Sequence, residues 1–314
     1  MGTLRRVARQ SFFKATTHGG NMAMDPKDLV REGRLAEALQ TLQDQVRKSP
    51  SDGKLRVFLF QMLCVTGEWE RAMTQLNVAA ELDPSVLLMA QVCRPALNCE
   101  ALRAEIFAGK RAPLVFGEPE EWVGWMIQAN SMAAEGHYGA AKELRDRALE
   151  AAPAVPGTIN GEPFEWIMDS DSRLGPILEV IIEGRYFWVP FTCIAGIALE
   201  KVEDLRDLVW VPAHFTWANG GAGLGLIPVR YPGSEKAEDA GLRLSRRTEW
   251  RELEGELYVA LGQRVLATDT GDHALLDIQV ISLDTVKGGD EGAEPPEAGD
   301  GAPGSEANEG GENA

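Results

Sequence analysis

The densest group of side chains that could do chemistry lies in the segment GEPFEWIMDSDSRLGP at 161–176. It holds four carboxylates and one arginine: Glu162, Glu165, Asp169, Asp171 and Arg173. Neighbouring carboxylates can share a proton or hold a cation, which is the chemistry of a hydrolase or a metal site. The structural alternative is that the two aspartates cap a turn and that Arg173 pairs with one of them. Because no base, nucleophile or ligand triad accompanies the group, we favour the structural role and predict no catalytic residue and no metal.

Two other patterns resemble ligand sites only in part. The glycines of GGAGLG at 220–225 lack the spacing of a dinucleotide fingerprint, and the next segment reads as a strand instead of a helix. We therefore interpret 220–225 as a flexible loop between strands. The histidines and cysteines show no metal-ligand spacing: His18, His137, His214, His273, Cys64, Cys93, Cys99 and Cys193. The sequence predicts no cofactor.

The charge balance restricts the class of partner. The 314 residues carry a net charge of −17, which argues against binding to nucleic acid or to anionic membranes. No run of 18 apolar residues occurs, so insertion into a membrane is not expected either. A basic or amphipathic protein partner fits this acidity better. Cysteines in apolar surroundings without a paired motif are typical of the reducing cytosol.

The elements that must position any site begin with a repeat of 34 residues, the period of a tetratricopeptide unit. The first two copies read Gly33, Ala38, Leu42 and Pro50, then Gly67, Ala72, Leu76, Ala79 and Pro84. A third unit has Gly136, Ala141, Ala148 and Pro153, with Arg145 where the earlier copies have leucine. Such units are helical hairpins that stack into an array with a groove for a peptide. Between the second and third copies, Pro95 is expected to break or restart a helix.

From Gly157 onward, helical periodicity gives way to short β-rich runs separated by Gly, Asp and Pro. The predicted fold is therefore α+β. An all-α tetratricopeptide-like domain over 24–156 precedes a small, mainly-β, barrel-like domain over 157–283. The basic stretch 1–23 is interpreted as a disordered extension, with translation starting at Met1, Met22 or Met24. The Gly/Glu/Pro-rich stretch 284–314 is interpreted as a disordered acidic tail.

The second half is specific enough to resemble a known family. It contains NGEPFEWIMDSDSRLGPILEVIIEGRYFWVPF at 160–191, LRDLVWVPAHFTW at 205–217, LIPVRYPGS at 226–234, TEW at 248–250 and GQRVLATD at 262–269. These segments resemble the ImpE or TagJ family of type VI secretion accessory proteins. The motif residues, which we expect to serve packing more than chemistry, are Asn160, Trp166, Asp169, Asp171, Arg173, Gly175, Pro176, Tyr186, Trp188, Trp210, Arg230, Tyr231 and Trp250.

The resemblance implies a non-enzymatic, cytoplasmic adaptor. Family members are described as engaging the N-terminal helix of the small contractile-sheath subunit and as connecting to the ATPase that recycles contracted sheaths. Two alternatives stay open: a hydrolase or metal-dependent enzyme that uses the acidic cluster, and a general peptide-binding scaffold.

Position in the repeat predicts where a partner helix would lie. The front helix of each hairpin faces the groove, and its exposed positions are mixed apolar and polar, which suits an amphipathic helix. The predicted groove residues are Lys54, Val57, Gln61, Cys64, Val123, Met126, Asn130 and Ala133. Binding on the β domain, or in the cleft between the domains, is the alternative.

Overall fold

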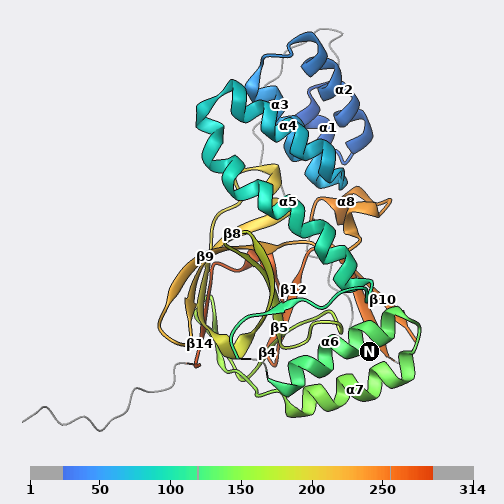
Figure 1. Ribbon diagram of the computed structural model, residues 1–314, viewed down its shortest axis with the longest axis vertical. Helices are drawn as coiled ribbons and strands as arrows, with labels where there is room; N and C mark the ends of the chain where they lie inside the picture. The colour runs from blue at the N-terminus through green and yellow to red at the C-terminus, as the bar shows by residue number, and fades with distance from the viewer. Residues whose placement is uncertain (1–23, 119, 255, 286–314) are drawn as a thin grey trace, which may run out of the picture.

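The computed structural model describes residues 24–118, 120–254 and 256–285. The predictions for 1–23, and for the tail from 286 onward, lie outside these residues. The first half is helical: α1 (Pro26–Arg31), α2 (Leu35–Lys48), α3 (Gly53–Thr66), α4 (Trp69–Leu82), the 3-10 turn η1 (Pro84–Val86), α5 (Leu87–Phe107), α6 (Glu121–Ala134) and α7 (Tyr138–Ala151). In Figure 1, α1–α4 form one end of the molecule, α6 and α7 lie at the other end, and α5 runs between them.

Local signals account for most helix ends. Asp25 caps α1 by accepting a hydrogen bond from the Lys27 amide at 2.8 Å, and Pro26 occupies the first helical position. Asp52 caps α3 in the same way, and Gly67 ends that helix in the left-handed region at φ 75°. The helical hairpins predicted from the repeat are confirmed.

Helix α5 is 21 residues long and continues through Pro95, where the sequence predicts a break or a restart. The proline ring packs against the turn at Gly184, where an added Cβ would lie 2.7 Å from the Cβ of Pro95. Pro95 therefore costs one helical hydrogen bond but gains a close contact with the sheet. The predicted break is wrong because a distant turn stabilises the uninterrupted helix.

The second half is dominated by a curved sheet of nine strands in the order β1-β6-β5-β9-β8-β7-β14-β2-β3. Its members are β1 (Leu114–Val115), β2 (Gly157–Ile159), β3 (Glu162–Phe164), β5 (Ile177–Ile182), β6 (Arg185–Pro190), β7 (Ile194–Leu199), β8 (Trp210–Trp217), β9 (Ala222–Pro228) and β14 (Val280–Leu283). Figure 1 shows that this sheet is strongly curled. Two smaller sheets accompany it: β10 (Thr248–Leu253) with β11 (Leu257–Gly262), and β4 (Ile167–Asp169) with β12 (Val265–Thr268) and β13 (Gly271–Ala274). The predicted α+β class is confirmed.

The glycine-rich segment is only partly a loop. Gly220 lies in a turn, but Gly223 and Gly225 belong to β9, which pairs antiparallel with β8. A Cβ at Gly225 would lie 2.9 Å from the ring of Phe215, so the missing side chain makes room for an aromatic ring on the neighbouring strand. The loop prediction is corrected accordingly: these glycines serve packing within the sheet.

One hydrophobic core lies between the helical and sheet-rich halves, and a second lies within the sheet-rich half. A single cluster joins Leu63, Leu76 and Ala96 of the helices with Ile177 and Trp188 of the sheet. Strand β1, from the helical half, pairs in parallel with β6. Strand β2 begins at Gly157, and the shared core means that the two halves stabilise each other.

Candidate partner-binding site

The acidic cluster does not form one site. Glu162 and Glu165 are exposed, whereas Asp171 is completely buried and its carboxylate accepts hydrogen bonds from the Arg173 guanidinium at 2.8 and 2.6 Å. The same carboxylate accepts from the backbone amides of Arg173 and Ala260. The structural interpretation, a capped turn with an aspartate–arginine pair, is confirmed. Both carboxylate oxygens of Asp171 therefore accept hydrogen bonds within the fold.

Asp169 belongs to a buried ion network that crosses the molecule. Arg264, which is fully buried, bonds to the carboxylates of both Asp169 and Glu179. Glu179 also accepts two hydrogen bonds from Arg103 of α5, at 2.5 and 2.9 Å. Burial raises the pKa of Glu179, but the attraction of Arg103 and Arg264 outweighs it and leaves that pKa at about 2. Burial raises the pKa of Asp169 to about 6, against the attraction of Arg264.

The aromatic and tyrosine motif residues complete this network. The Tyr186 hydroxyl donates to Glu179, and Trp188 Nε1 donates to the Tyr186 oxygen at 2.9 Å. Tyr231 donates to Asp169 at 3.0 Å. Since the polar atoms of these side chains bond to one another, the arrangement contributes to holding the fold together.

Two further motif residues of the second half, Arg230 and Trp210, form hydrogen bonds to helices α3 and α5. Arg230 donates to the carbonyl oxygens of Cys64 and Val65 at 3.0 and 2.7 Å, at the carboxyl end of α3, where a cation is favoured. Trp210 Nε1 donates to Glu100 of α5 at 2.8 Å. These contacts set the position of α3 and α5 relative to the β strands. Glu179 and Arg264 lie in the motif segments, but the sequence assigns neither a role, and Arg103 lies outside these segments and was missed.

The remaining motif residues have varied surroundings. Asn160 and Gly161 form the two-residue turn between β2 and β3, and both have positive φ. Gly175, at φ 55°, precedes Pro176 just before β5. Trp166 is half-buried. Trp250 is 36% exposed and lines a pocket, so its role in packing stays a prediction.

Three of the predicted groove residues do line a hollow. Lys54, Val57 and Gln61 of α3 share it with Phe58, with Lys27 and Val30 of α1, and with Glu203, Asp204 and Leu205. The last three lie at the start of the 3-10 turn η3 (Leu205–Leu208), which belongs to the β half of the sequence. The hollow has a volume of about 280 Å³. Its far wall was not foreseen, because nothing in the local sequence indicates that this loop packs beside α3.

The hollow has an apolar floor and charges of opposite sign on its two rims. Val30, Val57, Phe58 and Leu205 supply the apolar part. Lys27 and Lys54 are exposed on the repeat side, and Glu203 is exposed on the opposite side. A volume near the lower limit for small-molecule pockets fits a side chain or two of a docked helix better than a cofactor.

The other predicted groove residues are buried and need correction: Cys64, Val123, Met126, Asn130 and Ala133. The reason is that α5 and the sheet occupy the side of the repeat that would otherwise be open. Asn130 donates to the carbonyl of Ile106 at 2.9 Å, and Ala133 packs in a cluster with Leu257 of β11. The third hairpin therefore presents no open groove at these positions.

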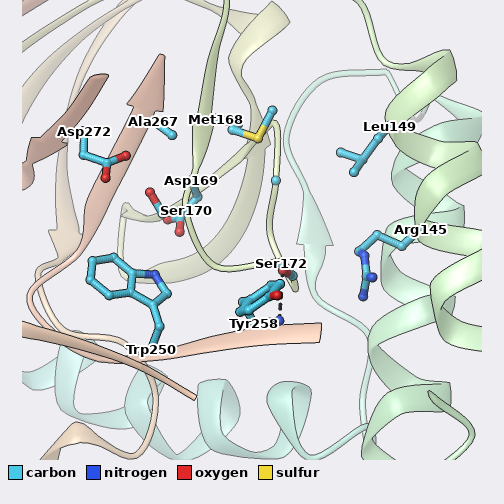
Figure 2. A pocket seen from close by; sticks show the side chains of 11 residues that line it. Arg145, Leu149, Met168, Asp169, Ser170, Ser172, Trp250, Tyr258, Ala267 and Asp272 are labelled. Carbon is cyan, nitrogen blue, oxygen red and sulfur yellow. Dashed lines mark hydrogen bonds between the residues drawn. The ribbon is translucent and has the colours of Figure 1, made fainter. Parts of the chain in front are cut away.

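A second pocket, of about 360 Å³, lies between α7 and the smaller sheets (Figure 2). Arg145 and Leu149 of α7 form one wall, while Trp250 and Tyr258 of the β10–β11 pair lie opposite. Met168 and Asp272 line it from β4 and β13. Two partly exposed aromatic rings give this pocket the character of a contact surface.

Within 24–118, 120–254 and 256–285, no group of three or more His, Cys, Asp or Glu side chains is placed to hold a metal ion. No helix among these residues combines the length and the hydrophobicity that crossing a bilayer requires.

Comparison with known proteins places this arrangement in a family. Residues 161–282 match the model of the ImpE protein family, and residues 29–92 match a tetratricopeptide repeat model. The type VI secretion system accessory component TagJ of Pseudomonas aeruginosa is 49% identical over 265 residues, covering 84% of this chain and 93% of that protein. The crystal structure of protein VPA1032 from Vibrio parahaemolyticus superposes with a TM-score of 0.74 at 28% identity, covering 82% of this chain and 97% of that one. The chain therefore belongs to the ImpE family, together with TagJ.

Proposed function

We propose that this protein is a cytoplasmic, non-enzymatic adaptor of a type VI secretion system, which binds the N-terminal helix of the small sheath subunit. The observation that carries the proposal is the hollow between α1, α3 and the loop before η3, in a chain that is 49% identical to a type VI secretion accessory component. A link to the ATPase that recycles the sheath is part of the same proposal. The enzyme alternative loses its main support, because Asp169 and Asp171 are paired with buried or half-buried arginines.

The chemistry of the hollow specifies how a helix would be recognised. One apolar side chain of the helix would enter the floor beside Val57 and Phe58. Acidic residues on one flank of the helix would face Lys27 and Lys54, and basic residues on the other flank would face Glu203 and Asp204. This arrangement selects both an amphipathic helix and its direction, because reversing the helix sets like charges against each other.

The test is a binding titration with the full chain, since the shared core argues against separating the halves. A fluorescent peptide with the sequence of the sheath subunit's N-terminal helix is titrated with wild-type protein and with Val57→Asp and Lys54→Glu. A buried charge in the floor should weaken affinity at least tenfold, which corresponds to about 1.4 kcal/mol. Reversing one rim charge should weaken it less and should make it less dependent on salt.

Val92→Asp is the matched control. Val92 lies on α5 with 52% of its surface exposed, next to Leu88, which is 76% exposed. The control should bind like the wild type, and thermal unfolding of each variant should show that the fold is kept. Loss of binding by Val92→Asp but not by Val57→Asp would move the site to α5. Absence of binding by the wild-type chain would refute the proposed partner.

A further inference from the structure

Strand β10 belongs to a two-stranded sheet and has one edge without a strand partner among the described residues. The outer edge of β11, by contrast, is hydrogen-bonded to the turn at Asp171 and Ser172. Strand β10 pairs with β11, and with no other strand among the described residues. Its side chains are exposed or half-buried along its whole length, from Thr248 to Leu253. An exposed strand edge of this length presents a row of unpaired backbone groups that can pair with another chain.

The hydrogen-bond pattern shows which residues point their backbone outward. The Gln263 amide donates to the Arg247 carbonyl at 3.0 Å, and the register then pairs Thr248 with Gly262 through to Leu253 with Leu257. In an antiparallel pair, bonded and non-bonded residues alternate. Glu249 and Arg251 therefore bond to β11, while Thr248, Trp250 and Glu252 direct their N–H and C=O groups to the open edge.

We propose that β10 pairs with β10 of a second copy of this chain around a two-fold axis through Trp250. In that register the two Trp250 residues exchange both backbone hydrogen bonds, and Thr248 pairs with Glu252 on either side. Glu249 lies opposite Arg251 of the other copy, twice by symmetry. Moving the axis by one residue sets Glu249 against Glu249 or Arg251 against Arg251, so the charges select a single register.

The side chains on the pocket face support the same pairing. Trp250 is 36% exposed and lines the pocket of about 360 Å³ together with Tyr258. In the paired form the two indoles would be cross-strand neighbours, and each would lose exposed apolar surface. Glu249 forms an ion pair with Arg247 of its own chain at 2.6 Å, and the arginine of the second copy would add a second cation beside the same carboxylate.

Sedimentation of the full chain over a range of concentrations tests the proposal. The wild type should shift from monomer to dimer as concentration rises, and more salt should weaken the dimer. Arg251→Glu alone and Glu249→Arg alone should each stay monomeric, because each sets like charges against each other. The double variant Glu249→Arg/Arg251→Glu should recover the dimer.

A mixture of the two single variants gives the sharpest result. One carries two acids and the other two bases at these positions, so an equimolar mixture should form a heterodimer, although each variant alone stays monomeric. A monomeric wild type would overturn the proposal, and so would a dimer that Arg251→Glu leaves unchanged. Both single variants should bind the sheath-subunit peptide like the wild type, which keeps this inference separate from the proposed function.

Discussion

Replacing Glu179 by glutamine removes one charge from the centre of the buried network while keeping the shape of the side chain. The carboxylate is fully buried and bonds to Arg103, Arg264 and Tyr186. Its loss leaves two buried guanidinium groups with less compensation. Removing one partner of a buried pair costs about 3–5 kcal/mol, and we expect this loss of unfolding free energy at pH 7.

The effect should depend on pH with a defined sign. The pKa of Glu179 is lowered from 4.5 to about 2 in the folded protein. The unfolded chain therefore binds the proton more readily, and acid favours unfolding. The drop corresponds to about 3 kcal/mol of stability, which is fully present above pH 4.5 and is lost as pH falls towards 2.

Urea unfolding followed by tryptophan fluorescence provides the measurement. The difference in unfolding free energy between wild type and Glu179→Gln should shrink below pH 4.5, by up to about 1.4 kcal/mol per pH unit. The pKa of Asp169, raised to about 6, acts in the opposite sense, and because repulsion from Glu179 contributes to that rise, Glu179→Gln should also move the pKa of Asp169 towards its ordinary value. Glu162→Gln, at an exposed carboxylate, is the control and should show little change. A difference that stays constant from pH 6 to pH 3.5 would refute the assignment of Glu179 as an ionised, arginine-paired group.

Three further experiments test the packing. Trp210→Ala should lower the unfolding free energy by about 3–5 kcal/mol in a urea titration, because Trp210 is 2% exposed. Trp250→Ala should lower it far less, because Trp250 is 36% exposed. Equal effects would contradict this difference in burial. Gly184→Ala should lower the melting temperature, because φ at Gly184 is 75° and the new Cβ would meet Pro95. The expected loss of unfolding free energy is about 1–3 kcal/mol. An unchanged melting temperature would show that the turn and α5 adjust freely. Burial raises the pKa of Cys93 to about 11 and the pKa of Cys64 above its usual range. Alkylation of both thiols, mapped by mass spectrometry, is therefore expected only after the protein unfolds. Early labelling of Cys64 would mean that α3 opens locally.

The sequence alone determined features that arise from neighbouring residues. The 34-residue spacing of glycine and proline indicated the helical hairpins, and Asp25 and Asp52 mark helix starts that the structure confirms. The pairing of Asp171 with Arg173 was also predictable, because they are two positions apart and a turn brings them together. Periodicity and capping report such local preferences directly.

Tertiary structure decided whatever depends on residues far apart in the chain. Glu179 is neutralised by Arg103 and Arg264, which lie 76 and 85 residues away, and no local pattern pairs them. The hollow beside Val57 needs the loop at Glu203, and the predicted groove at Met126 disappears because α5 and the sheet fill it. Helix α5 stays continuous at Pro95 because the proline ring packs against the turn at Gly184. A side chain's spacing shows which face of its element it occupies, but which distant element covers that face is set by the packing of the whole chain.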